Sequence, residues 1–183
     1  MVRGVDDRNI LDDFTISFCD VVSKYCRYII VSGFVVISSG RTRATEDIDM
    51  IIERISLDSF KKLHNALLNQ NFVCVQTDDV LEIYDYLHNN ISVRYTYKDE
   101  PLPEMELKFA KDGLDDIQIQ TKAKLPLTGL DIWFSNVEMN IAFKEHLLKS
   151  DKDLKDAQHL RLVYDVDEYK ITYYKSLIER YRL

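Results

Sequence analysis

Two acids interrupt an apolar run in the segment DIDMII, residues 47–52, and this segment constrains the fold more than any other part of the chain. In an extended strand successive side chains point to opposite faces, and residues two apart lie roughly 6.5 to 7 Å from each other on one face. Asp47 and Asp49 should therefore share one face, while Ile48 and Met50 share the other. The segment predicts a strand whose apolar face joins the core and whose acidic face needs a compensating partner.

Two kinds of partner could compensate the acidic face. Like charges this close raise each other's pKa unless a cation neutralises them, and carboxylate oxygens suit Mg²⁺ or Mn²⁺. Alternatively, the acids lie at an exposed strand end and meet water or the nearby Arg41 and Arg43. The residues alone leave both interpretations open.

Apolar periodicity along the rest of the chain predicts an α+β fold, with a mixed β-sheet flanked by helices and a C-terminal helical part. We expect a helix near residues 11–25, a helix with Ser56 or Asp58 as its cap, and a helix with Thr77 as its N-cap. We also expect the segments 91–97 and 105–110 to pair as a hairpin. The predicted strands are 28–32, 47–52, 71–76, 91–97 and 105–110.

Length and composition predict one compact unit, with a core over residues 1–135 and a helical segment over residues 136–183 packed on it. The net charge of −7 argues against a sequence-independent polyanion binder, because phosphate contacts need clustered Lys and Arg. We expect neither membrane association nor a signal peptide, and hence a cytoplasmic location, because apolar runs are short and the first residues are acidic. The spacing of the three cysteines favours buried thiols over a disulfide or a zinc site.

One motif extends beyond the acidic strand. Ser32 and Gly33 precede the pair Asp47 and Asp49 by a fixed gap, and apolar residues follow. This arrangement resembles the signature of the nucleotidyltransferase (DNA polymerase β-like) superfamily. The stretch GRTRATEDIDMII is most similar to the loop and strand of minimal bacterial and archaeal members related to the abortive-infection E toxins.

The resemblance continues in two later segments. The family carries a third acid in an apolar strand, and MELKF supplies Glu106 at that place. It also carries a helical lysine followed by a Lys-Asp-x-x-Asp turn, which here corresponds to Lys144 and then to Lys152, Asp153 and Asp156. The match thus covers four segments in the family's order, between about residues 28 and 160.

The resemblance implies the nucleotidyltransferase fold and the transfer of a nucleoside monophosphate from an NTP to a hydroxyl acceptor. It implies that Asp47, Asp49 and Glu106 are catalytic and bind Mg²⁺ or Mn²⁺. It further implies an NTP-binding set, which consists of Ser32, Gly33, Arg41, Arg43 and Lys144.

Several functions remain open within this resemblance. A toxin of a toxin–antitoxin pair would act on tRNA or on a protein and would have an antitoxin as partner. An enzyme of the antibiotic-modifying kind would act on a small molecule. The family usually has glycine where this chain has Ser32, and a non-catalytic nucleotide-binding module would show the same departure.

Overall fold

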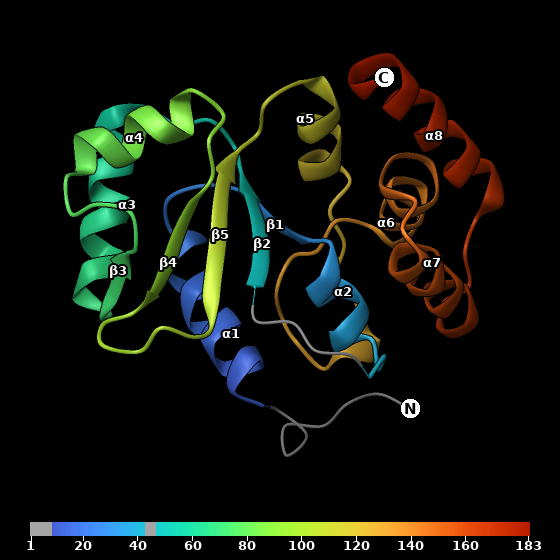
Figure 1. Cartoon of the computed structure of the whole chain (residues 1–183), viewed down its shortest axis with the longest axis horizontal. Coiled ribbons are helices and arrows are strands. Elements are labelled where there is room, and N and C mark those ends of the chain that lie inside the picture. Colours follow the sequence, from blue (N-terminus) through green and yellow to red (C-terminus); the bar gives the residue numbers. More distant parts are fainter. Residues whose placement is uncertain (1–8, 43–46) are drawn as a thin grey trace.

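The computed structural model describes residues 9–42 and 47–183 and contains a five-stranded mixed sheet flanked by helices (Figure 1). The strands are β1 (Tyr28–Val31), β2 (Asp47–Ile52), β3 (Phe72–Cys74), β4 (Val93–Tyr97) and β5 (Glu104–Phe109). Their order across the sheet is β1-β2-β5-β4-β3. β2 and β5 run parallel, whereas the other neighbouring pairs run antiparallel. The α+β prediction and the predicted β4–β5 hairpin are confirmed.

The helices lie on both sides of the sheet. Figure 1 shows α1, α3 and α4 on one side, and α2, α5 and the C-terminal helices α6 to α8 on the other. Their bounds are α1 (Ile10–Val22), α2 (Gly33–Ser38), α3 (Leu57–Asn69), α4 (Val80–His88), α5 (Gly113–Gln120), α6 (Val137–Phe143), α7 (Asp151–Val163) and α8 (Glu168–Arg182). A π-helical turn, η3 (Lys144–Leu148), continues α6, and a 3₁₀ turn, η2 (Pro126–Thr128), precedes it.

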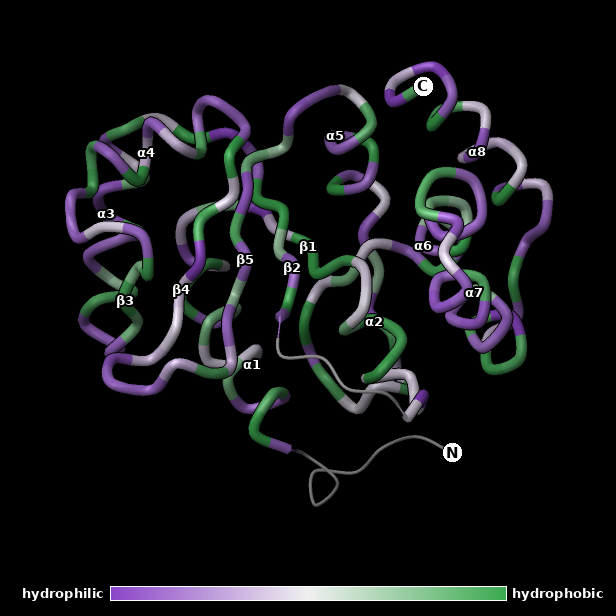
Figure 2. Tube along the Cα trace, viewed as in Figure 1, coloured by the Kyte–Doolittle hydropathy of each residue, from purple (hydrophilic) through white to green (hydrophobic). Residues whose placement is uncertain are grey.

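The main core lies between the sheet and the helices α1, α3 and α4. Alternation along the strands sends Ile48 and Met50 of β2 into this core, together with Met105 and Leu107 of β5, and all four are fully buried. Aromatic rings of α1 pack edge-on against the sheet, as Phe18 does against Phe72 with ring centroids 5.0 Å apart. Figure 2 shows the hydrophobic segments gathered around the sheet, whereas α7 is largely hydrophilic.

The other face of the sheet is covered only in part by the described helices. A second, smaller apolar cluster lies there, formed by Ile29, Val31, Ile51, Ala110 and Ile119 of α5. The remainder of this face carries the outward-pointing side chains of β2 and β5, including Asp49 and Glu106. Partial cover of one sheet face therefore leaves room for a site.

Local signals explain most helix starts, with two differences from the sequence-based expectation. Ser56 caps α3 as predicted, since its side chain accepts from the backbone N–H of Ser59. The cap of α4 is Asp79, so the assignment to Thr77 is wrong, and the Thr77 hydroxyl instead accepts from the N–H of Asp79 at 3.2 Å. Helix α5 was not predicted, although Asp112 caps it by accepting from the N–H groups of Leu114 and Asp115.

The chain returns to the sheet between α5 and α6 before it becomes helical. Phe134 forms an isolated parallel bridge with Ile30 of β1, and Asn136 then caps α6. From this point the described chain consists of α6, η3, α7 and α8, in agreement with the predicted helical segment. Among the described residues, no helix has the length and apolar character that a membrane span requires.

Candidate active site

The pairing of β2 with β5 brings two acids side by side on the partly covered face of the sheet. Asp49 lies directly opposite Glu106 across the parallel pair, and Asp47 lies opposite Glu104. On the other side of β2, Asp49 faces Val31, the last residue of β1. Asp49 and Glu106 are half-buried, whereas Asp47 is exposed at the strand end. The strand register therefore brings two of the three predicted catalytic acids together.

Asp49 is a carboxylate whose ionised form is destabilised by its surroundings. Burial raises its pKa, and the negative charges of Glu106 and Asp47 raise it further. The positive charge of Lys108 and a hydrogen bond from the Ser32 side chain act in the opposite direction without cancelling the rise. In the absence of a ligand, the site thus holds more negative charge than its surroundings stabilise.

The turn between β1 and α2 has an unusual backbone geometry at Ser32. Ser32 has φ 64° and ψ −129°, a region that favours glycine, and it is the residue before the first turn of α2. Its N–H donates to Oδ1 of Asn140 in α6 at 3.2 Å. Gly33 is buried in the first turn of α2. The serine at this position therefore keeps a conformation for which glycine is better suited.

We expect Ser32→Gly to have a higher free energy of unfolding than Ser32→Ala, by about 1 kcal/mol. Both substitutions remove the hydroxyl that bonds to Asp49, but only glycine adopts the positive φ without strain. Urea denaturation of the two variants measures the difference. Equal stability of the two variants would show that no strain is stored at this turn.

A cleft of about 510 Å³ lies between the acids and the helices on the same side of the sheet. One wall comes from the end of β1, from β2 and from β5, and contains Ser32, Asp49 and Glu106. The opposite wall comes from α5, α6, η3 and α8, and contains Gln118, Asn140 and Phe143 among others. A volume of this size suits a nucleotide-sized ligand, because small-molecule sites span about 300 to 1,000 Å³.

Lys144 lines this cleft, but its charge is engaged in a buried ion-pair network. Its Nζ donates to Oδ2 of Asp156 at 2.8 Å and to Oδ1 of Asp153 at 3.3 Å. The side chains of Lys144 and Asp156 are 2% and 0% exposed. Arg41 forms an ion pair with the other oxygen of Asp156 and donates to the carbonyl of Lys152. The network fastens the end of α2 and η3 to the first turns of α7.

Arg41 and Arg43 were predicted to bind the NTP. Arg41 belongs to the Asp156 network, and it is not among the described residues that line the cleft. Arg43 lies outside the described residues. The role of both arginines in NTP binding stays a prediction.

The donor chemistry of the acids fits Mg²⁺ or Mn²⁺, although the ligand set is not assembled. Carboxylate oxygens are the donors that these ions prefer, and burial together with the neighbouring acids raises the pKa of Asp49, so that a bound cation would offset the cost of its charge. Within residues 9–42 and 47–183, however, no three His, Cys, Asp or Glu side chains gather closely enough to hold a metal ion. A three-carboxylate site would require the exposed side chain of Asp47 to turn toward Asp49 and Glu106.

The structure adds two residues to the site that the sequence-based prediction did not include. Lys108 lies two residues after Glu106 on the same face of β5, and the alternation in MELKF could have indicated it. Asn140 connects α6 to the Ser32 turn, and its Nδ2 donates to the carbonyls of Ser135 and Asn136. No pattern in the sequence links Asn140 to a residue 108 positions earlier.

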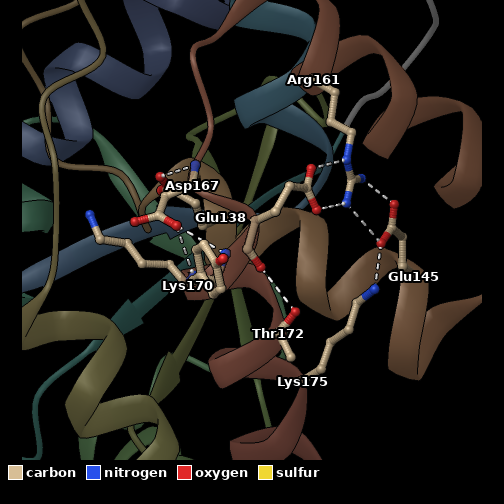
Figure 3. A network of polar contacts seen from close by, with 9 residues as sticks. Glu138, Glu145, Arg161, Asp167, Lys170, Thr172 and Lys175 are labelled. Atoms are coloured by element: carbon tan, nitrogen blue, oxygen red, sulfur yellow. Dashed lines mark hydrogen bonds and ion pairs between the residues drawn. The ribbon is translucent and has the colours of Figure 1, made fainter.

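A second polar network braces the helices that form the far wall of the cleft (Figure 3). Arg161 of α7 pairs with Glu145 of η3, and its Nε donates to Glu168 of α8 at 2.8 Å. Lys175 of α8 pairs with the same Glu145 at 2.7 Å. Three consecutive helical elements are thus joined, which holds the wall as one unit opposite the sheet.

Comparisons with known proteins identify the fold. No protein-family model matches the sequence, and no curated protein is significantly similar to it. Among solved structures, the antibiotic-resistance factor ANT(2'')-Ia in solution is similar with a TM-score of 0.52 and 11% identity, over 92% of this chain and 93% of that chain. The same factor in complex with adenylyl-2''-tobramycin gives a TM-score of 0.55 and 11% identity, over 94% and 98%.

A third solved structure is similar over most of its length. It is an antigenic nucleotidyltransferase-like protein from Paracoccidioides brasiliensis, with a TM-score of 0.53 and 16% identity, over 92% of this chain and 87% of that chain. At these identities the likeness concerns the arrangement of helices and strands, and it extends over nearly the whole of each chain. The chain described here therefore has a nucleotidyltransferase fold.

Proposed function

We propose that the protein is a nucleotidyltransferase that moves a nucleoside monophosphate from an NTP to a hydroxyl acceptor and releases pyrophosphate. One observation carries this proposal: the β2–β5 register sets Asp49 beside Glu106 at the wall of a nucleotide-sized cleft. The fold and the four matching sequence segments support it. Asp47, at the start of β2, completes the proposed set of catalytic acids.

Asp47, Asp49 and Glu106 are the residues that would hold Mg²⁺ or Mn²⁺. Bound there, the ions would stabilise the charge on the entering and leaving oxygens of an in-line displacement at the α-phosphorus. Glu106 is positioned beside Asp49 to accept the proton of the acceptor hydroxyl. Ser32 would orient Asp49 through its hydroxyl, which bonds to that carboxylate.

The acceptor belongs to the proposal as well. The sequence resemblance to abortive-infection E toxins supports tRNA or a protein as acceptor, and an antitoxin as partner. The likeness in fold to ANT(2'')-Ia, whose structure holds adenylyl-2''-tobramycin, supports a small molecule instead. These acceptor classes can be separated by experiment.

The test is transfer of label from each of the four α-³²P-labelled NTPs, with Mg²⁺ or Mn²⁺, to total RNA, to cell protein or to a panel of aminoglycosides. We expect one acceptor class to become labelled, with stoichiometric release of pyrophosphate. If no acceptor becomes labelled, calorimetric measurement of Mg-NTP binding shows whether the protein still binds the nucleotide. If the protein binds Mg-NTP but no acceptor and no condition releases pyrophosphate, it is a non-catalytic nucleotide-binding module and the proposal of transfer is wrong.

A further inference from the structure

Among the residues that the structure describes, four cationic side chains line the cleft, and carboxylates already engage two of them. Lys144 is held by Asp153 and Asp156. Arg182 of α8, whose side chain is 9% exposed, pairs with Asp112 and with Oδ1 of Asp115, the latter at 2.7 Å. Recruiting either charge for a ligand would break a buried or nearly buried ion pair, which is costly.

The other two cationic side chains, Lys108 and Lys111, differ because they form no ion pair in the described part of the chain. Both line the cleft. Across residues 9–42 and 47–183, no carboxylate lies within ion-pair distance of either ammonium group. Lys108 is half-buried on the face of β5 that carries Glu106, and Lys111 follows the end of β5 and is exposed. Among the described residues, these two lysines therefore hold the positive charge of the cleft that no ion pair engages, and Lys108 acts on Asp49 only at longer range, where it lowers the pKa of that carboxyl.

The strand register and one backbone hydrogen bond fix where the two lysines lie relative to the acids. Lys108 lies opposite Ile51 of β2, one step along the face from the Asp49–Glu106 pair. Lys111 is held near α5, because its backbone N–H donates to Oδ2 of Asp115 at 2.9 Å. Asn90 and Ser92 line the same cleft and offer neutral hydrogen-bonding groups. The cleft thus has a cationic, hydrogen-bonding region directly beside its two acids.

We propose that Lys108 and Lys111 bind the phosphate groups of the nucleotide, a role that the sequence-based prediction gave to Arg41, Arg43 and Lys144. This inference rests on the proposed function, since it names residues that hold the substrate of the same site. A lysine ammonium binds phosphate as a point charge, and a partly buried one gains most from it when no ion pair has to be broken first. Lys144 and Arg41 then serve to hold the wall of the cleft.

The test is calorimetric titration of ATP, with Mg²⁺ present, into wild-type protein and into Lys108→Met, Lys111→Met and the double variant. Methionine keeps the length and apolar character of the lysine stem while removing its charge. We expect each single substitution to weaken binding about tenfold and the double substitution about a hundredfold, the scale for losing charge-assisted hydrogen bonds. Binding of adenosine, which has no phosphate, should change less than about twofold by the same reasoning.

The matched control is Lys62→Met. Lys62 is an exposed lysine of α3, on the other side of the sheet, and this variant should bind ATP as the wild type does. Titration of inorganic triphosphate separates the lysine assignment from the proposed function. If no nucleotide binds the wild type, the proposed function fails, and a lysine-dependent affinity for inorganic triphosphate supports only the weaker statement that the two lysines form a phosphate site. If ATP binds the wild type and both lysine variants equally, the assignment is overturned while the proposed function stands.

Discussion

Asp49→Asn is expected to abolish nucleotidyl transfer, by about a thousandfold or more, which corresponds to about 4 kcal/mol of transition-state stabilisation. The same variant should unfold at an equal or higher temperature than the wild type in EDTA. Asp49 faces Glu106 and is opposed by burial and by neighbouring acids, so neutralising it relieves repulsion in the free protein. Transfer assays and thermal melts of the purified variant measure the two effects together.

A catalytic role of the acids can be distinguished from a structural role by melting temperatures. These are measured for the wild type, Asp47→Asn and Asp49→Asn in EDTA and in Mg-NTP. If the acids serve the reaction, Mg-NTP should stabilise the wild type more than either variant. If they serve instead as structural ion pairs, both variants should melt lower in EDTA and keep the full shift with Mg-NTP. That second pattern would contradict catalysis at this pair.

The raised pKa of Asp49 also gives this prediction a pH dependence. Because the folded state binds the Asp49 proton more tightly than the unfolded state, the associated stability is present at low pH and is lost as the pH rises through the folded pKa. Asp49→Asn removes this loss, so its stability advantage over the wild type should grow over the pH range above the ordinary pKa of an aspartate, about 3.9. Urea titrations across that range in EDTA test the trend, and an advantage that shrinks with rising pH would contradict it.

Asp156→Ala is expected to lower the free energy of unfolding by about 3 to 5 kcal/mol, the usual cost of breaking a buried ion pair. The carboxylate is fully buried, and Arg41 and Lys144 converge on it from the ends of α2 and α6. Its removal leaves two cations close together, with Asp153 as the acid that still pairs with Lys144. Chemical denaturation of the variant measures the loss.

The matched control is Asp151→Ala in the first turn of the same helix, where the side chain is exposed. This substitution should lower the free energy of unfolding by less than about 1 kcal/mol, the scale of a helix-dipole interaction. Adding Lys144→Met to Asp156→Ala should recover part of the lost stability, because it removes a buried charge whose main partner is gone. Strict additivity of the two substitutions would show that Lys144 and Asp156 are not coupled.

The strands were predictable because their signal is local. In β2 and β5 every second residue is apolar and buried, so period-two alternation in DIDMII and MELKF fixed both the strands and the faces of their acids. The hairpin of β4 and β5 followed from their proximity along the chain. The division of the chain at residue 135 stays a prediction, because the strand-to-helix change near Phe134 marks a change of structure and not a domain boundary.

What the sequence could not provide is the charge balance across the cleft. The Lys-Asp-x-x-Asp turn marked Lys144 correctly as a helical lysine, but whether its charge is free depends on how α7 folds back onto η3. The alternation in MELKF places Lys108 on the same face as Glu106 but does not show whether its charge is paired. Its neighbours Asp49 and Arg182 come from distant segments, so the contrast between engaged and uncommitted cations appears only in three dimensions.

The contacts that join α2 to the C-terminal helices have a consequence for the order of folding. Ser32 bonds to Asn140, 108 residues later, and Ser39 shares a 2.8 Å hydrogen bond with Tyr164, 125 residues later. The β4–β5 hairpin closes a far shorter loop. It therefore loses less chain entropy and should form earlier during folding. The two walls of the cleft should therefore meet late, after the transition state of the sheet. A ligand that binds between them would then act mainly by slowing unfolding, with little effect on the rate of folding.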